Sequence, residues 1–254
     1  MTHSCVDLTG QVSIVTGAGR GIGRAIAIAL AAHGSDVVLL DISGADGEGT
    51  LNMLQPYGRK ASFFAVDVTS EEQVQECVSQ VLAEHGQIDN LINNVGVSSN
   101  LAFGDISLAE FQRILNINLT SYFIMCKAVV PAMHARKRGR IVMMSSGSAI
   151  TGSGGGVHYA ASKGGVNSLV RALARELAPS GILVNGVAPR TIATEALREL
   201  YPQEALKARL QQIPVGRLGT PDDVAHVTLF LLSDLSAFIC GEILLVDGGR
   251  TYCS

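Results

Sequence analysis

The stretch VSIVTGAGRGIG, residues 12–23, joins a run of apolar and β-branched residues to a turn rich in glycine. The run has the length and composition of a buried strand. The glycines let the backbone turn tightly and approach a bound group, just ahead of a helix whose first N–H groups favour an anion. The stretch predicts a strand–turn–helix unit that opens an α/β fold and binds a phosphate group. A plain βα turn would also use glycine, so the rest of the chain has to decide.

Six more apolar runs follow, separated by stretches with apolar residues at helical spacing, for example Val74, Val78 and Val81. Strands that read as continuous apolar runs are covered on both faces, as in a parallel sheet. The alternation predicts a doubly wound Rossmann fold, a seven-stranded parallel sheet flanked by helices. The expected strands are VSIVTG from Val12, DVVLLD ending at Asp41, SFFAVDV ending at Val68, IDNLINNVG ending at Gly96, RIVMMSS ending at Ser146, ILVNGVAP ending at Pro189 and EILLVDGG ending at Gly249.

The bulk composition argues against several classes of protein. A net charge of −3 disfavours nucleic-acid binding, and we interpret the basic cluster at 134–140 as a solvated helix end. The N-terminal MTHSCVDLTG lacks the features of a signal peptide, and no apolar run approaches the ~20 residues of a membrane span. The five cysteines are scattered and the six histidines lack metal-ligand spacing. We expect a cytoplasmic protein without metal, membrane or nucleic-acid partners.

Ligands of doubly wound sheets bind beyond the carboxyl ends of the strands. The first turn does not fit GxGxxG, because Ile22 stands where the third glycine belongs, but a glycine turn with a wider first gap does fit. The residues to inspect are therefore Gly17, Gly21 and Gly23 of that turn and the strand ends Asp41, Asp67, Asn94, Ser146 and Pro189.

Asp41 ends the second expected strand, eighteen residues after Gly23. A carboxylate there can accept hydrogen bonds from both hydroxyls of an adenosine ribose. It would repel a 2′-phosphate, at about 4 kcal/mol for one unit of like charge at ~4 Å and an effective dielectric constant of ~20. Arg20 in the turn would favour that phosphate, but Asp41 is the residue aimed at the ribose. The sequence therefore predicts NAD as the cofactor.

A second group of polar residues surrounds GVHYAASKGGV, residues 156–166. Tyr159 and Lys163 share a helix face, a spacing that also occurs by chance. Ser146 stands thirteen residues before Tyr159, and Asn118 lies within a helix expected over 108–130, where asparagine is a poor helix former. A nearby ammonium favours the phenolate of a tyrosine, whose ordinary pKa of ~10 makes it a poor base at neutral pH.

These elements together resemble the short-chain dehydrogenase/reductase family over nearly the whole chain. TGxxxGxG, NNVG at 93–96, the Asn, the Ser and YxxxK occur in the family's order. The resemblance implies that Tyr159 is the general acid or base, assisted by Ser146, Lys163 and a water-holding Asn118. It also implies one domain over 1–254, with a cofactor half at about 8–100, a catalytic half at about 101–254 and a substrate loop at about 190–214. The cofactor contacts expected are Gly17, Arg20, Gly21, Ile22, Gly23, Asp41, Asp67, Val68, Asn94, Gly96, Tyr159, Lys163, Pro189, Ile192 and Thr194.

Two positions depart from the family pattern. Val95 stands where the family usually has Ala, and Arg190 where it usually has Gly after Pro. Arg190 could bind an anionic group of the substrate or the cofactor pyrophosphate, or it could point to solvent or pair with Glu195. We expect Ser146, Ser148 and Arg190 to contact substrate. His158, beside Tyr159, is interpreted as a packing or rim residue.

The sequence thus predicts an NAD(H)-dependent oxidoreductase that interconverts a secondary alcohol (a sugar, polyol or hydroxy acid) and its ketone or lactone. A 3-oxoacyl-[acyl-carrier-protein] reductase is the alternative within the family, although that role usually goes with NADPH. A degenerate nucleotide-binding regulator is the alternative outside enzymes. The helix at 108–130 has apolar residues on more than one face, which is more than one sheet can cover: Phe111, Ile114, Leu115, Leu119, Tyr122 and Ile124. Together with the resemblance, these faces imply a homotetramer, with a dimer as the alternative.

Overall fold

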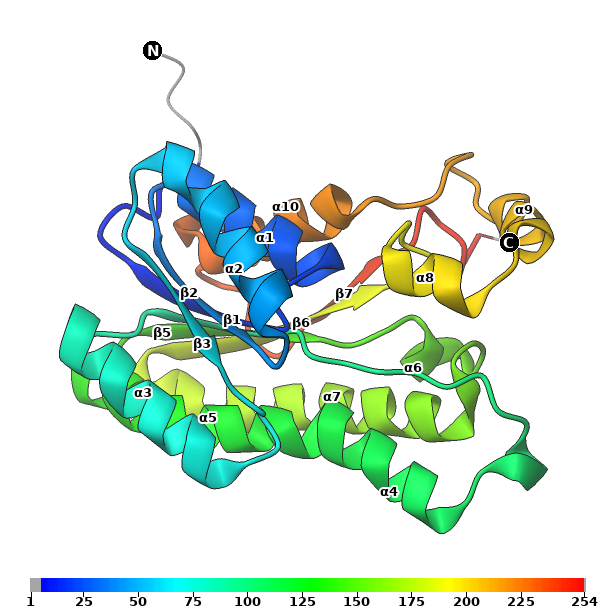
Figure 1. Ribbon diagram of the computed structural model, residues 1–254, viewed down its shortest axis with the longest axis horizontal. Coiled ribbons are helices and arrows are strands. Elements are labelled where there is room, and N and C mark those ends of the chain that lie inside the picture. Colours follow the sequence, from blue (N-terminus) through cyan, green and yellow to red (C-terminus); the bar gives the residue numbers. More distant parts are fainter. Residues whose placement is uncertain (1–5, 254) are drawn as a thin grey trace.

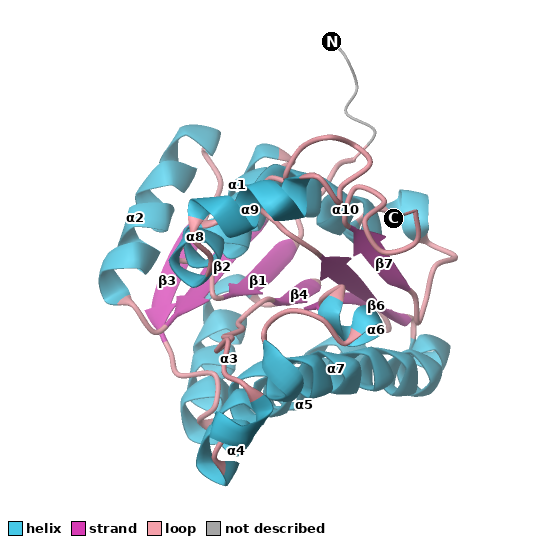
Figure 2. Cartoon of the chain, turned by 90° about the vertical axis from the view of Figure 1, so that its right-hand side faces the viewer, coloured by secondary structure: helices cyan, strands magenta, loops and turns pink. Residues whose placement is uncertain are grey.

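The computed structural model describes residues 6–253, in which seven strands form one parallel sheet of order β3-β2-β1-β4-β5-β6-β7 (Figures 1 and 2). This confirms the predicted Rossmann fold. Cys5 and the start of the N-terminal stretch inspected for a signal peptide lie outside the described residues. The strands are β1 (Val12–Thr16), β2 (Asp36–Asp41), β3 (Ala61–Ala65), β4 (Asn90–Asn93), β5 (Gly139–Met144), β6 (Ile182–Pro189) and β7 (Ile243–Val246).

Several strands end earlier than their apolar runs predicted. β4 stops at Asn93 rather than Gly96, β5 at Met144 rather than Ser146, and β3 and β7 are shortened in the same way. Beyond β4 the backbone is held by side chains instead of a neighbouring strand: Thr16 Oγ1 accepts a hydrogen bond from the N–H of Asn94 at 2.9 Å. The residues that follow β3 and β4, at 66–68 and 94–96, line a cleft rather than a sheet.

Helices cover both faces of the sheet. In Figure 1, α1, α2 and α10 lie on one face and α3, α5 and α7 on the other, each face with its own apolar core. Single 3₁₀ turns occur at Gln55–Tyr57, Phe103–Asp105, Ala178–Ser180 and Asp234–Ser236. The helices are α1 (Gly21–Ala32), α2 (Gly44–Leu54), α3 (Glu71–His85), α4 (Leu108–Leu115), α5 (Ser121–Arg136), α6 (Ser148–Thr151), α7 (Gly156–Leu177), α8 (Glu195–Leu200), α9 (Gln203–Leu210) and α10 (Pro221–Leu232).

The helix expected over 108–130 is longer and interrupted. A π-helical segment, Asn116–Thr120, joins α4 to α5. By length and composition Leu108–Arg136 could cross a membrane, but the inner side of α5 packs into the core through Tyr122, Met125 and Val129. It is therefore a core helix of the sheet.

Sequence reasoning expected a loop at 190–214, but α8 and α9 occupy most of it and lie beyond the carboxyl ends of the strands (Figure 2). Thr194 caps α8, because its hydroxyl accepts a hydrogen bond from the N–H of Leu197 at 3.2 Å. Pro202 then separates α8 from α9. Short capped helices of this kind carry little periodic signal, so the sequence alone did not show them.

Candidate active site

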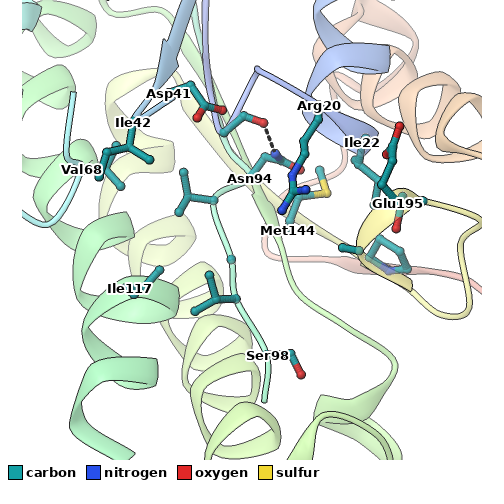
Figure 3. A pocket seen from close by; sticks show the side chains of 18 of the residues that line it. Arg20, Ile22, Asp41, Ile42, Val68, Asn94, Ser98, Ile117, Met144 and Glu195 are labelled. Carbon is teal, nitrogen blue, oxygen red and sulfur yellow. Dashed lines mark hydrogen bonds between the residues drawn. The ribbon is translucent and has the colours of Figure 1, made fainter. Parts of the chain in front are cut away.

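A cleft of about 690 Å³ opens at the carboxyl ends of the strands. Figure 3 shows Asp41 and Ile42 at one end of it, Ser98 at the other and Asn94 between them. Of the residues predicted to contact the cofactor, the wall includes Gly17, Arg20, Gly21, Ile22, Asp41, Asp67, Val68, Asn94, Gly96, Tyr159, Lys163, Pro189, Ile192 and Thr194. A cleft of this size and position is the usual place for a nucleotide in such a sheet.

The glycine turn shapes one end of the cleft. Gly17 and Gly21 have φ of +62° and +57°, where a side chain would be strained. Gly23 lies behind the wall: a Cβ there would stand 2.0 Å from the carbonyl oxygen of Gly17. Gly23 therefore brings α1 against the end of β1 rather than touching the cleft. The first turn of α1 has no side-chain cap, so its N–H groups fit an anionic group such as a pyrophosphate.

The carboxylate of Asp41 is held in place from two sides. Its Oδ2 accepts a hydrogen bond from the N–H of Gly19 at 2.8 Å, and its Oδ1 accepts one from Ser43 at 3.0 Å. Arg20 is half exposed and its guanidinium lies 3.4 Å from Glu199 of α8, also exposed. An ion pair in solvent is weak. Asp41 is thus the pre-oriented charge at this end of the cleft.

Tyr159 and Ser146 meet near the opposite end. Tyr159 lies in the first turn of α7, where Gly155 leaves room for its ring: a Cβ on Gly155 would be 2.5 Å from Tyr159 Cδ1. Burial raises the pKa of Tyr159, a hydrogen bond with Ser146 lowers it, and the Tyr201 phenol raises it further. Ser146 itself is buried and its Oγ accepts a hydrogen bond from the N–H of Ser148 at 3.1 Å. The serine is therefore fixed beside the phenol.

Lys163 lines the cleft one helical turn after Tyr159 but is almost fully buried, with 2% of its surface exposed. Its Nζ donates hydrogen bonds to the carbonyl oxygen of Met144 at 2.7 Å and to the hydroxyl of Tyr122 at 3.3 Å. Burial lowers the pKa of Lys163 to about 7. The amine is therefore close to its titration point near neutral pH.

Asn118 does not line the cleft but supports it. Its Oδ1 accepts a hydrogen bond from the N–H of Val97 at 2.8 Å, and its Nδ2 donates to the carbonyl oxygen of Val97 at 2.9 Å and to Ser162 Oγ at 3.1 Å. The side chain thus joins the π-helical segment, the cleft wall and α7. Both hydrogens of Nδ2 are used, so the predicted contact of Asn118 with a bound water would have to use the second lone pair of Oδ1 or the backbone.

Arg190 does not pair with Glu195. Its guanidinium donates to Ser153 Oγ at 2.8 Å and to Thr251 Oγ1 at 3.0 Å, and its aliphatic stem lies against Gly147. Within residues 6–253 no carboxylate lies within ion-pair distance of it. The charge is therefore held by neutral hydroxyls, next to the segment that carries Ser146.

His158 and Ser148 have separate partners. His158 is fully buried and its Nε2 lies 2.6 Å from Ser99 Oγ, which in turn donates to Glu110 at 2.8 Å. This agrees with its interpretation as a packing residue. Ser148 Oγ donates to the carbonyl oxygen of Ser153 at 2.8 Å. No group of three His, Cys, Asp or Glu side chains suited to a metal ion occurs in the described part of the chain.

The chain is similar to known proteins along most of its length. The sequence profile described as "Enoyl-(Acyl carrier protein) reductase" matches residues 17–251. The 3-oxoacyl-[acyl-carrier-protein] reductase FabG of Aquifex aeolicus (strain VF5) is 38% identical over 245 residues, 96% of this chain and 98% of the relative. The chain belongs to the short-chain dehydrogenase/reductase family. The expected resemblance is confirmed, and the protein is an oxidoreductase acting on CH–OH groups.

Two solved short-chain dehydrogenases with bound nicotinamide cofactors have the same fold. A 7 alpha-hydroxysteroid dehydrogenase complexed with NADH and 7-oxo glycochenodeoxycholic acid superposes with a TM-score of 0.93 at 35% identity, covering 96% of this chain and 95% of that one. An NAD+-bound xylitol dehydrogenase superposes with a TM-score of 0.89 at 32% identity, covering 95% and 99%. A nicotinamide cofactor is typical of short-chain dehydrogenases, and the cleft described above fits one.

Sequence reasoning missed several residues of this short-chain dehydrogenase. Glu195, Leu197 and Glu199 of α8 form one wall of the cleft, although the region was expected to be a loop. Tyr122 was expected only as one of the apolar residues on the mixed faces of the helix at 108–130, yet its hydroxyl accepts a hydrogen bond from Lys163. Tyr122 follows Asn118 by four residues and so shares its helix face, which is the one signal that could have indicated it.

Proposed function

We propose that this short-chain dehydrogenase uses NAD(H) to interconvert a secondary alcohol and its ketone, with Tyr159 as general acid or base. The supporting observation is the hydrogen bond of Ser146 with Tyr159 at the end of a cleft that Tyr159 and Lys163 both line. A phenol, a hydroxyl donor and an amine in one place suit proton transfer at a carbonyl or alcohol oxygen.

Each side chain has a distinct role in this proposal. In alcohol oxidation the Tyr159 phenolate accepts the substrate's hydroxyl proton, and in ketone reduction the phenol donates it. The Ser146 hydroxyl donates a hydrogen bond to the substrate oxygen, where negative charge develops. The Lys163 ammonium favours the phenolate and binds the ribose beside the nicotinamide. Hydride transfer is the chemistry that a nicotinamide supplies when it is bound. A water held by Asn118 transfers protons between Lys163 and solvent.

NAD rather than NADP is proposed because Asp41 presents a fixed carboxylate to the ribose end of the cleft. Its two hydrogen bonds from backbone N–H groups hold the carboxylate in place. A 2′-phosphate, which carries about −1.5 to −2 charges at neutral pH, would be repelled there. Arg20 could offset this only by leaving Glu199, and its charge is exposed and screened.

For the substrate we propose a sugar, polyol or hydroxy acid, with an anionic group facing Arg190. The guanidinium lies next to Ser153, on the segment between Ser146 and Tyr159, and its hydroxyl partners leave its charge unneutralised within residues 6–253. A carboxylate, sulfonate or phosphate would provide the missing counter-charge in a forked contact. Ser148 would contact the same substrate.

A 3-oxoacyl-[acyl-carrier-protein] reductase is the second candidate, favoured by the 38% identity to a relative with that name. A catalytically degenerate regulator is disfavoured because Asn118, Ser146, Tyr159 and Lys163 are all present. The experiment is to measure turnover of polyols, sugars, hydroxy acids and oxoacyl thioesters with NAD(H) and NADP(H). Turnover of oxoacyl thioesters alone, with NADPH, would replace the first candidate by the second.

We further propose that residues 1–254 act as one unit, as a cytoplasmic homotetramer without nucleic-acid or membrane partners. Ile114, Tyr122 and Ile124, which were expected to need a partner, are buried within the chain. Phe123 of α5 and Phe238 near β7 remain exposed, at 51% and 104%. These exposed apolar side chains, on two different parts of the chain, support the proposal of contacts with other copies. Sedimentation at micromolar concentration tests the proposal, and a monomer would contradict it.

A further inference from the structure

The hydroxyl of Tyr122 is a polar group in the core, directly behind the cleft. Tyr122 comes from α5 and is 1% exposed. Its oxygen lies 2.9 Å from the carbonyl oxygen of Val95, 3.2 Å from that of Met144 and 3.3 Å from Nζ of Lys163. Val95, Met144 and Lys163 all line the cleft. The phenol therefore contacts three parts of the cleft wall from the side of the protein core.

The hydrogen count decides the direction of each bond. A phenol has one hydrogen to donate, which the closer carbonyl of Val95 takes, and its lone pairs can accept from Lys163. The ammonium of Lys163 has three hydrogens, of which Met144 and Tyr122 take two. Its Nζ also lies beside the exposed backbone of Gly96, where a Cβ would be 3.2 Å away. One hydrogen is thus left for a ligand in the cleft.

The aromatic ring of Tyr122, like its hydroxyl, stabilises the charged amine of Lys163. Nζ of Lys163 lies 5.0 Å from the centroid of the ring, within the range of a cation–π interaction. Both contacts favour the charged amine over the neutral one.

We propose that Tyr122 is a positioning residue that holds the Lys163 amine, in its charged form, against the cleft. The inference rests on the proposed binding of the cofactor ribose by Lys163. This role of Tyr122 is additional to the proposed roles of the glycine turn, Tyr159 and Lys163.

The physical need for such a residue is clear from the surroundings of Lys163. Burial lowers its pKa to about 7 with both hydrogen bonds in place, so a large fraction of the amine is neutral above that pH, and losing a contact that favours the ammonium would lower the pKa further. The titratable group in contact with it is the phenol of Tyr122, and Tyr159 precedes it by one helical turn on α7. Segments 93–97, 116–120 and 144–146 contain no acidic or basic residue. Burial also raises the pKa of Tyr122 well above its usual value, so the phenol remains neutral and cannot replace a carboxylate.

The test is the pH dependence of NADH affinity, followed by fluorescence from about pH 6 to about pH 10, a range that spans the lysine titration. The four proteins are the unmodified enzyme, Tyr122→Phe, Lys163→Met and the double variant. Tyr122→Phe keeps the buried ring and removes only the hydroxyl. The affinity of the unmodified enzyme should fall as Lys163 loses its proton, and Tyr122→Phe should move that fall to lower pH by about half a unit or more. In the Lys163→Met background the same change should leave the pH dependence flat.

Other outcomes separate the possible failures. If Lys163→Met binds NADH as the unmodified enzyme does at every pH, the proposed role of Lys163 is wrong. If Lys163→Met weakens binding but Tyr122→Phe leaves the midpoint in place, the role of Tyr122 alone is wrong. An equal loss of affinity at every pH in Tyr122→Phe would mean that the hydroxyl acts only through Val95, which also overturns the proposal. In Tyr122→Phe, the loss of kcat/KM at alkaline pH should also begin at a lower pH than in the unmodified enzyme.

Discussion

The carboxylate of Asp41 accepts a hydrogen bond from the backbone N–H of Gly19 at 2.8 Å, which joins the end of β2 to the turn that follows β1. The charge at the proposed ribose end of the cleft is therefore held by the glycine turn that shapes the proposed pyrophosphate end. A side chain held in this way cannot swing aside for a 2′-phosphate without losing that bond and the one from Ser43.

Asp41→Asn should narrow the preference for NAD(H). The amide keeps the size of the side chain and an oxygen for the Gly19 N–H, but removes the charge. Half of the about 4 kcal/mol expected for the like-charge repulsion corresponds to more than a tenfold gain in kcat/KM with NADP(H). Steady-state kinetics with both cofactors measures it. Equal use of NAD(H) and NADP(H) by the unmodified enzyme would contradict the assignment of Asp41.

Tyr159→Phe should reduce turnover by about a hundredfold or more, because only the proton-transferring hydroxyl is removed. NADH should still bind, as fluorescence titration would show. Tyr57→Phe, at an exposed site in the turn after α2, is the matched control and should leave the rate unchanged. Near-normal turnover of Tyr159→Phe would exclude the tyrosine as the acid or base.

Ser146→Ala should move the pH profile of alcohol oxidation toward higher pH. Burial raises the pKa of Tyr159 and the hydrogen bond with Ser146 lowers it, so the variant's phenol should lose its proton at a higher pH. Oxidation needs the phenolate, so its rate rises with pH, and this rise should occur at a higher pH in the variant. Ketone reduction needs the phenol, so its rate falls with pH, and this fall should also move to a higher pH. Ser79→Ala on α3 is the control. A lower rate with an unmoved limb would mean that Ser146 acts on the substrate alone.

The same Gly→Ala change should have opposite effects in α1 and α2. In Gly23→Ala the new Cβ would overlap the carbonyl oxygen of Gly17, so unfolding free energy should fall by about 1–3 kcal/mol and NADH should bind more weakly. In Gly49→Ala the methyl group meets nothing within 4 Å, and helix propensity should raise stability by about 0.5–1 kcal/mol. Urea denaturation of both variants measures the difference. Equal stabilities would show that α1 can move away from β1 at little cost.

Arg190→Gln should raise KM for acidic substrates by the equivalent of about 1.5–3 kcal/mol, the scale of a charged hydrogen bond. Neutral substrates and NAD affinity should hardly change. Thr251→Val removes the 3.0 Å bond that braces the guanidinium but keeps the charge, so it should have a much smaller effect. If both variants behave alike, Arg190 braces the C-terminal segment and does not bind an anion.

The sequence by itself determined the order of the strands and of the long helices between them, because periodicity and glycine turns are local properties of the chain. It also determined that the residues at the strand ends matter, since parallel strands share one carboxyl edge: Gly17, Asp41, Asn94 and Pro189 all line the same cleft. Asp41 could be singled out because its place at a strand end is encoded in the apolar run before it.

Only the tertiary structure decided what depends on distances between elements far apart in the chain. Gly23 proved to be a packing position because its neighbour is a carbonyl of Gly17 rather than the cleft. Arg190 took hydroxyl partners from residues 37 and 61 positions away, and Tyr122 met Lys163 across 41 positions. No local pattern encodes such pairs, because which side chains meet is fixed by how α5, α7 and the sheet pack together.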